Sequence, residues 1–294
     1  MCGATIEQPC IDDGGTAGDA APGDAAGNGD AGDACAMCTA ATGIQQSNYT
    51  CMTAPTSDGR GVLTSCYNSD YQCVGGRAPR GFEPRRTCAP NRTAGRLAHM
   101  AQLEAASVDA FHLLRSDLAR NGAPRHMLRS IDAAVADEIR HARTVGRAAE
   151  RFGACVPPVS VAPGSPRSLE QLAIDNAAEG CVTEAFGAAI ATLQSERASD
   201  PRVRRMLRAI ARDETEHAAL AWRIADWLDA RLDAGARARV LAARRTAVEA
   251  LRAGLETDAG GDEVLGLPDS SAVRAVLDAM EEALVTGDLA RAAA

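Results

Sequence analysis

The chain contains no lysine. All 31 of its basic residues are arginine, in a chain of 294 residues. Without a lysine side chain, Schiff-base catalysis and a lysine-bearing phosphate-binding loop are both excluded. The net charge of −8, together with the lack of an arginine run, argues against nucleic acid as a partner.

Aromatic residues and long apolar runs are also scarce. Phe, Trp and Tyr make up 3% of the chain, so the core must be built from Ala, Leu, Val and Ile, a composition that suits closely packed helices. No apolar run approaches the ~20 residues that a membrane-spanning helix needs.

Cysteine is abundant but confined mostly to one end. Of the 10 cysteines, only Cys155 and Cys181 lie beyond residue 88. The others are Cys2, Cys10, Cys35, Cys38, Cys51, Cys66, Cys73 and Cys88. A cysteine-dense segment with few apolar residues predicts a disulfide-stapled module, and hence an oxidising compartment. The alternative is a zinc site, although only Cys35 and Cys38 form the close pair that such sites use.

The first residues predict a location. Met1-Cys2-Gly3-Ala4 resembles the start of a processed bacterial lipoprotein, with Met placed before the lipid-bearing cysteine. We therefore expect an extracytoplasmic protein, periplasmic or membrane-anchored, with a lipid on Cys2, although no signal peptide is visible in this sequence. The alternative is an ordinary N-terminus in which Cys2 is unmodified.

Composition divides the chain into segments. Residues 1–34 form an N-terminal tail and an acidic Gly/Ala/Asp linker that cannot bury enough surface to order itself. Residues 35–92 form a Cys-rich module of loops and short strands. Residues 93–232 carry helical periodicity over four long stretches, and 233–294 form an extension of two shorter helices.

The helix signals predict two hairpins. Helices are expected at about 93–121, 124–152, 168–198 and 201–232, with a Ser168/Gln171 capping box opening the third and Pro201 opening the fourth. A short turn joins the first helix to the second, and another joins the third to the fourth. The connection between the two hairpins, residues 153–167, is long enough to run back along the bundle. The predicted fold class is therefore all-α: a four-helix bundle with one long crossover, which is the ferritin-like topology.

The two predicted hairpins repeat a set of acidic residues and histidines. The first carries Glu104 and then Glu138-x-x-His141, and the second carries Glu179 and then Glu214-x-x-His217. The spacing between the glutamates is 34 residues (104 to 138) in one hairpin and 35 (179 to 214) in the other. Because residues three apart on a helix point the same way, each Glu-x-x-His can hold one metal ion.

These polar residues interrupt the apolar stripe of each helix near its middle. Taken singly, each glutamate could face solvent and each histidine could be an ordinary core residue. Here that explanation would have to hold four times at repeated spacings. Four buried carboxylates without compensation would cost several kcal/mol each, and two divalent cations remove that cost.

The pattern resembles the di-iron carboxylate proteins of the ferritin-like superfamily, among them rubrerythrins, ribonucleotide reductase small subunits and bacterial multicomponent monooxygenases. The resemblance covers residues 95–230. It implies that Glu104, Glu138 and His141 serve one iron, and that Glu179, Glu214 and His217 serve the other, with one carboxylate of each Glu-x-x-His motif bridging. The implied cofactor is two iron ions, with manganese as the alternative.

The resemblance also assigns orienting residues. Asp137-Glu138-Ile139-Arg140-His141 looks like the monooxygenase form of the motif, in which the Asp accepts a hydrogen bond from the histidine of the opposite motif. It implies that Asp137 and Asp213 orient the two histidines. The alternative is that both are surface acids. The second motif departs from the first, with Glu216 in place of Arg140, which implies looser support.

Other departures narrow the chemistry. All three tyrosines (49, 67 and 71) precede the helices, which argues against a tyrosyl radical, and no second Cys-x-x-Cys follows the first, which argues against a rubredoxin-type iron centre. Glu184 follows Glu179 by five residues, about 140° around an α-helix, so the sequence predicts that it points away from the ligands.

The sequence leaves the reaction open. One hypothesis is an oxidoreductase that uses O2 or peroxide, with iron, peroxide or a small organic molecule as substrate and an external electron donor. The others are a surface protein that stores or senses metal without turnover, and a structural module that the metals hold together.

Overall fold

The computed structural model describes residues 49–55, 62–68, 77–79, 82, 84, 85, 87, 89–161, 165–255 and 261–292. The acidic linker, the lipid-anchor motif at Cys2 and the Cys35/Cys38 pair lie outside these residues. Two strands, β1 (Tyr49–Pro55) and β2 (Val62–Asn68), pair antiparallel within the predicted Cys-rich module.

The register of this hairpin leads to a prediction about disulfides. It places Cys51 directly opposite Cys66. Opposed Cα atoms in antiparallel strands lie roughly 4.5–5.5 Å apart, within the roughly 4.4–6.8 Å that a disulfide spans. We therefore expect a Cys51–Cys66 disulfide in protein from an oxidising compartment. Peptide mapping without reduction should find these two peptides linked, and finding both thiols alkylated before reduction would contradict the prediction.

Helices make up most of the rest of the described chain. Their order is α2 (Arg92–Arg120), α3 (Arg125–Arg151), α4 (Leu169–Asp175), the π-helix η1 (Asn176–Glu184), α5 (Ala185–Arg197), α6 (Pro201–Asp229), α7 (Ala234–Leu255) and α8 (Ser270–Ala292). The predicted capping box is confirmed: Ser168 and Gln171 exchange side-chain to backbone hydrogen bonds. Asp200 caps α6, and Pro201 occupies its first turn.

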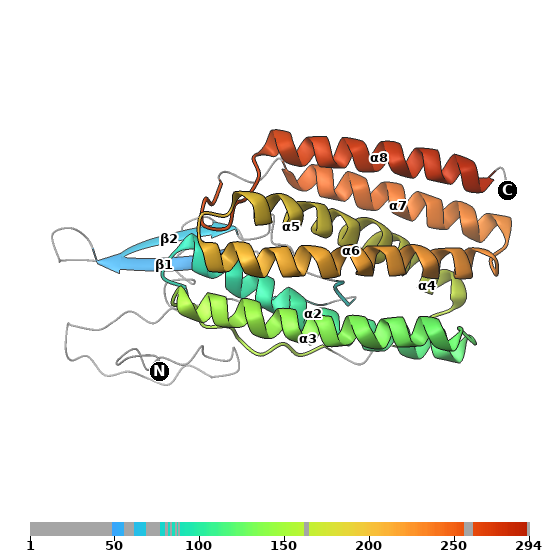
Figure 1. Ribbon diagram of the computed structural model, residues 1–294, viewed down its shortest axis with the longest axis horizontal. Helices are drawn as coiled ribbons and strands as arrows, with labels where there is room; N and C mark the ends of the chain where they lie inside the picture. Colours follow the sequence, from blue (N-terminus) through green and yellow to red (C-terminus); the bar gives the residue numbers. More distant parts are fainter. Residues whose placement is uncertain are drawn as a thin grey trace, which may run out of the picture.

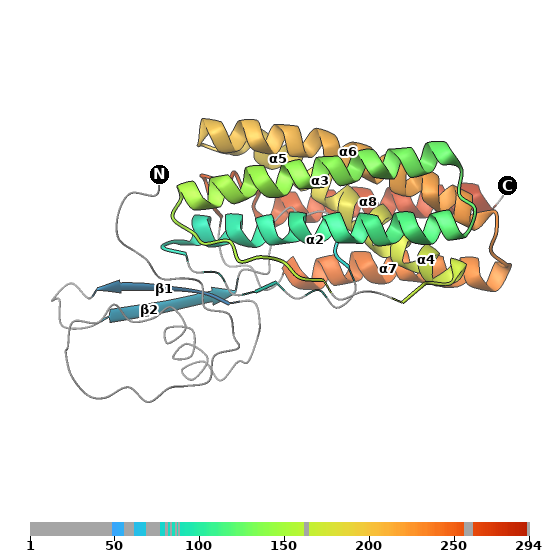
Figure 2. The same cartoon turned by 90° about the horizontal axis from the view of Figure 1, so that it is seen from below.

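The helices form an elongated bundle (Figure 1). α2 packs along α3, the segment from η1 to α5 packs along α6, and α3 and α6 join the two pairs. α7 and α8 pack on the other side of the η1–α5 segment. In Figure 2, α4 begins at the opposite end of the bundle from the point where α3 ends, so the connection between them runs back along its length. None of the described helices is both long and apolar enough to cross a membrane.

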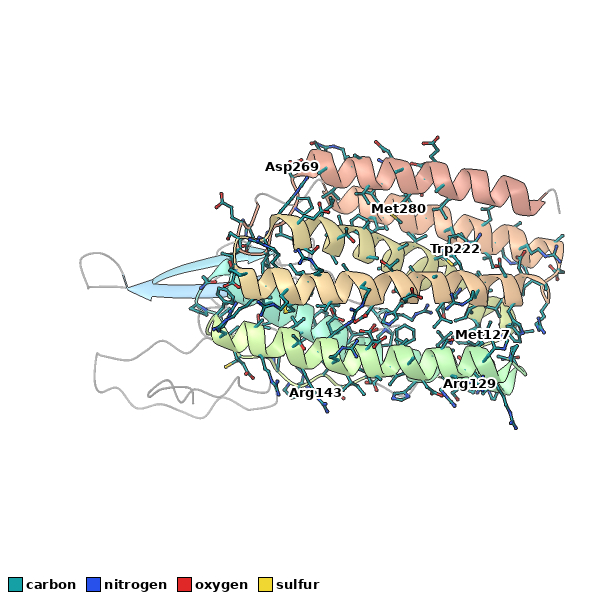
Figure 3. The ribbon with its side chains drawn as sticks, in the orientation of Figure 1. Met127, Arg129, Arg143, Trp222, Asp269 and Met280 are labelled. Atoms are coloured by element: carbon teal, nitrogen blue, oxygen red, sulfur yellow. The ribbon has the colours of Figure 1, made fainter. Side chains whose placement is uncertain are left out.

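The amphipathic pattern is clearest in α3. Arg129 and Arg143 extend outward from it into solvent (Figure 3), whereas Ile131 and Val145 on the opposite face are completely buried. Buried side chains form two large apolar clusters, one containing Leu97, Val145 and Leu207, the other containing Leu114, Ile131 and Ile224. Residues in the middle of α2, α3 and α6 lie between these clusters, so polar groups there are remote from water.

The third predicted helix differs from the sequence prediction of one regular α-helix. Residues 169–197 are helical, but the nine central ones, Asn176–Glu184, form a π-helix. Thr183 donates a side-chain hydrogen bond to the carbonyl of Ala178, five residues earlier, which matches the i→i+5 spacing. Such a segment places more residues in each turn, and therefore changes which side chains share a face.

Candidate metal centre

The middle of the bundle contains a cluster of buried acids and histidines. Glu104 comes from α2, Glu138 and His141 from α3, and Glu214 and His217 from α6. The three glutamates are 0% exposed, and His141 and His217 are 2% and 3% exposed. We call these five residues the central cluster. Since ionised carboxylates are almost never buried without a partner, the cluster demands compensating charge.

The two histidines point Nδ1 into the central cluster. His141 Nδ1 lies 3.5 Å from Glu104 Oε2 and 3.5 Å from Glu214 Oε1. His217 Nδ1 lies 3.1 Å from Glu138 Oε1 and 3.8 Å from Glu214 Oε1. The ring centroids are 6.1 Å apart. Ligand atoms of Glu104, Glu138, His141 and Glu214 all lie within 4.8 Å of one another, close enough to share one metal ion.

The oxygen and nitrogen atoms of the central cluster that could bind a metal have no hydrogen-bond partners among the described residues. Among the described residues, neither carboxylate oxygen of Glu104, Glu138 or Glu214 has a hydrogen-bond partner, and neither does Nδ1 of either histidine. The short distances above therefore lack hydrogen-bond geometry. Leaving a buried polar group unpaired costs about 1–3 kcal/mol, and more for a charged one. Carboxylate oxygens and imidazole nitrogens that converge without partners fit a site built for divalent cations.

The outer nitrogen of each histidine contacts an acid from the opposite hairpin. His141 Nε2 lies 3.2 Å from Asp213 Oδ2, and His217 Nε2 lies 3.3 Å from Asp137 Oδ2. These are the crossed contacts that the resemblance implied. A carboxylate on Nε2 favours the tautomer that carries its proton there, which leaves the Nδ1 lone pair directed at the central cluster.

One arginine links the two orienting acids. Arg140 Nη2 lies 2.7 Å from Asp137 Oδ1 and 2.7 Å from Asp213 Oδ2. Arg212 adds a contact of 3.0 Å to Asp213 Oδ1. Although the second motif has Glu216 in the position of Arg140, Asp213 is thus held by two arginines. Burial alone would raise the pKa of Asp213, but Arg140 and His141 outweigh it and lower the pKa.

Proton affinities in the central cluster are strongly perturbed. Burial lowers the pKa of a histidine, yet the carboxylates next to His141 and His217 more than offset it and raise both pKa values to about 11. Burial raises the pKa of Glu104 and of Glu138, and the neighbouring Glu214 raises both further. For Glu214, burial is outweighed by the two histidines, and the pKa is lowered. Without metal, the cluster therefore holds protons that metal binding must displace.

The third helix carries two glutamates that differ in burial and in their contacts. Glu179 is half-buried, and its Oε2 accepts a hydrogen bond of 3.4 Å from the backbone nitrogen of Ala78. Glu184 is 0% exposed. Burial raises the pKa of Glu184, and the positive charges of Arg77 and His217 act against that rise. The expectation that Glu184 points away from the site rested on regular α-helical geometry, which η1 does not have.

Arg77, from the segment before α2, reaches this side of the site. It is 4% exposed, with Nε 3.2 Å from Glu184 Oε1 and Nη2 3.2 Å from Asn176 Oδ1. Its guanidinium carbon lies 5.3 Å from the centre of the Phe111 ring, and that ring packs edge-on against His217. Arg77 thus touches both η1 and α2.

Comparison with known proteins gives no relative. The chain matches no protein-family model, no curated protein and no solved structure.

Sequence reasoning missed Arg77, Asn176 and the linking role of Arg140. Only one feature of the sequence indicated the position that Arg77 occupies. Gly180 lies within a helical stretch, where glycine indicates a close approach by another group. A Cβ at this position would collide with Arg77 Nη2 and would lie 2.6 Å from Ala221 Cβ. Glycine is therefore what admits the Arg77 side chain.

Proposed function

We propose that this chain is a di-metal protein with a ferritin-like helical bundle, and that it is an oxidoreductase using O2 or peroxide at two iron ions. The observation that carries the proposal is the set of unpartnered, fully buried donor atoms in the central cluster. Manganese is the alternative metal, because carboxylate and imidazole donors suit both.

The residues of the chain divide into clear roles in this proposal. Glu104, Glu138, His141 and Glu214 would hold one ion, and Glu138, Glu214 and His217 would also serve the second. Glu184 would complete the second position in place of Glu179. The four carboxylates then carry four negative charges, which two divalent cations neutralise. Bound iron would supply the electrons that reduce O2 or peroxide.

The surrounding residues support that chemistry. Asp137 and Asp213 would keep the histidine protons on Nε2, so that Nδ1 stays available. The two apolar clusters on either side would exclude bulk water, which strengthens the electrostatic interactions inside the site. A protein that stores or senses metal without turnover would need the same metal ligands. Measuring turnover as well as metal content therefore separates such a protein from an oxidoreductase.

Metal content and turnover test the proposal. Protein reconstituted anaerobically with Fe(II) should hold about two metals per chain. It should then consume O2 or peroxide steadily in the presence of ascorbate, above the rate of the same protein treated with chelator. Binding of one metal or none would overturn the di-metal assignment. Binding of two metals without steady consumption would leave a storage or sensing protein and overturn the oxidoreductase assignment.

A further inference from the structure

The two sides of the central cluster are not equivalent. On the side of His141, donor atoms of four residues already converge within 4.8 Å. On the side of His217, Phe111 packs edge-on against the histidine, and Arg77 lies over the Phe111 ring. Arg77 in turn contacts the buried carboxylate of Glu184, so this further carboxylate is engaged with a cation of the chain itself. Its Oε1 lies 3.2 Å from Arg77 Nε, and both side chains are almost completely buried.

Only one oxygen of Glu184 remains for a metal. Among the described residues, its Oε2 has no hydrogen-bond partner, although it is buried. Three contacts also fix Arg77. Asn176 accepts a hydrogen bond from its Nη2, and the Phe111 ring lies under its guanidinium group. Gly180, which has no side chain, leaves the space that the guanidinium group fills. Asn176 is fixed in turn by donating from Nδ2 to the carbonyl of Ala221 on α6. Withdrawal of the guanidinium would break its hydrogen bonds to Glu184 and Asn176, both in η1.

We infer that Arg77 is a positioning residue that makes the two metal positions unequal, and that the position beside His217 and Glu184 is the weaker and more readily exchanged. This inference rests on the proposed di-metal function. Arg77 holds Oε1 of Glu184, which restricts that carboxylate to a single ligand oxygen. Its positive charge, buried beside Glu184, would oppose binding of a second cation there because the dielectric screening is low.

Arg77 belongs to the last part of the Cys-rich module, before α2. This part of the chain is held at a second point, where Gln102 both donates to the backbone carbonyl of Arg85 (3.0 Å) and accepts from its nitrogen (2.7 Å). Gln102 is 1% exposed. The N-terminal part of the chain therefore contributes a charge to the centre of the bundle and sets the affinity of the second position.

Titration with Co(II) under anaerobic conditions tests the inference on the full chain, because cobalt reports its ligands through its visible absorption. Wild-type protein should bind two Co(II) ions in two separable steps. In Arg77→Met, which keeps a long side chain without the charge, the second step should tighten about tenfold or more, as expected from losing a charged hydrogen bond. Arg77→Lys, which keeps the charge, should leave the steps separated.

Two glutamate variants assign the carboxylate. Glu184→Gln should weaken the second step at least about tenfold and leave the first in place, and adding Arg77→Met to it should not restore that step. Glu179→Gln, the matched control on the same π-helix, should leave both steps intact.

The failures of the two proposals can be told apart. Wild-type protein that binds fewer than two Co(II) ions would overturn the proposed function itself. If wild type binds two but Arg77→Met leaves the second step unchanged or weaker, the inference about Arg77 is overturned and the di-metal function stands. The same holds if Glu179→Gln, rather than Glu184→Gln, removes the second step. Circular dichroism of each metal-free variant checks that the bundle has folded.

Discussion

Replacing Glu138 or Glu214 with alanine should abolish most of the rise in melting temperature that Fe(II) gives the wild-type protein. A ligand that binds only the folded state at a hundred times its Kd adds about 2.7 kcal/mol of stability. For a bundle of this size, that corresponds to roughly 5–10 °C in melting temperature. In the proposed di-metal site both glutamates would serve both metal positions, so loss of either should remove more than one ion.

The measurement is a set of anaerobic melting curves with and without Fe(II). Glu216→Ala is the matched control, because Glu216 is exposed on α6 only two residues from Glu214. Its metal-dependent gain should equal that of wild type. If Glu216→Ala lost the gain while Glu138→Ala and Glu214→Ala kept it, the assignment of the central cluster as the metal site would be wrong.

The metal-free protein should lose stability as the pH rises from about 5.5 to 9. The pKa values of His141 and His217 in the folded protein are raised from 6.5 to about 11. A raised pKa means that the folded state binds more protons than the unfolded chain, so the stabilisation is complete below 6.5 and is lost as the pH rises toward 11. The raised pKa values of Glu104 and Glu138 act with the same sign above pH 4.5.

Groups with lowered pKa values limit how much stability the metal-free protein gains as the pH is lowered. Glu214 and Asp213 contribute stability that is present above their unfolded pKa values and is lost as the pH falls through the folded ones. The melting temperature of chelator-treated protein should therefore be highest in mild acid. Glu138→Gln, which mimics the protonated carboxyl group, should flatten the decline toward pH 9. A melting temperature that rises steadily from pH 5.5 to 9 would contradict the prediction, and saturating metal should reduce the slope.

Much of the architecture could be predicted because its signals are local. The capping box at Ser168, Asp200 before Pro201 and the turn around Gly122 mark helix ends within one or two residues of those observed. Glu138-x-x-His141 and Glu214-x-x-His217 needed only helical periodicity to place their side chains together, and the structure places all four in the central cluster. Such features depend on neighbours three or four residues away.

The parts that could not be predicted depend on distant contacts. Nothing in the residues of 176–184 specifies i→i+5 hydrogen bonding over the regular pattern, so the choice between Glu179 and Glu184 could not be made from the sequence. Arg77 lies 107 positions before Glu184 and within a segment that reads as loop. A contact between residues so far apart in the sequence produces no periodic pattern, and only Gly180 indicated that another group approaches the helix there.

The crossed contacts between histidines and aspartates have a consequence for assembly. His141 from the first hairpin depends on Asp213 from the second, and His217 from the second depends on Asp137 from the first. Neither hairpin therefore holds a complete half of the site, and an isolated hairpin would present a histidine whose tautomer nothing fixes. The site comes into existence only when α3 and α6 have docked. If the cluster binds metal as proposed, tight uptake would report on the docking of α3 with α6, and a nascent chain that has made only its first hairpin would lack the full set of ligands for an ion.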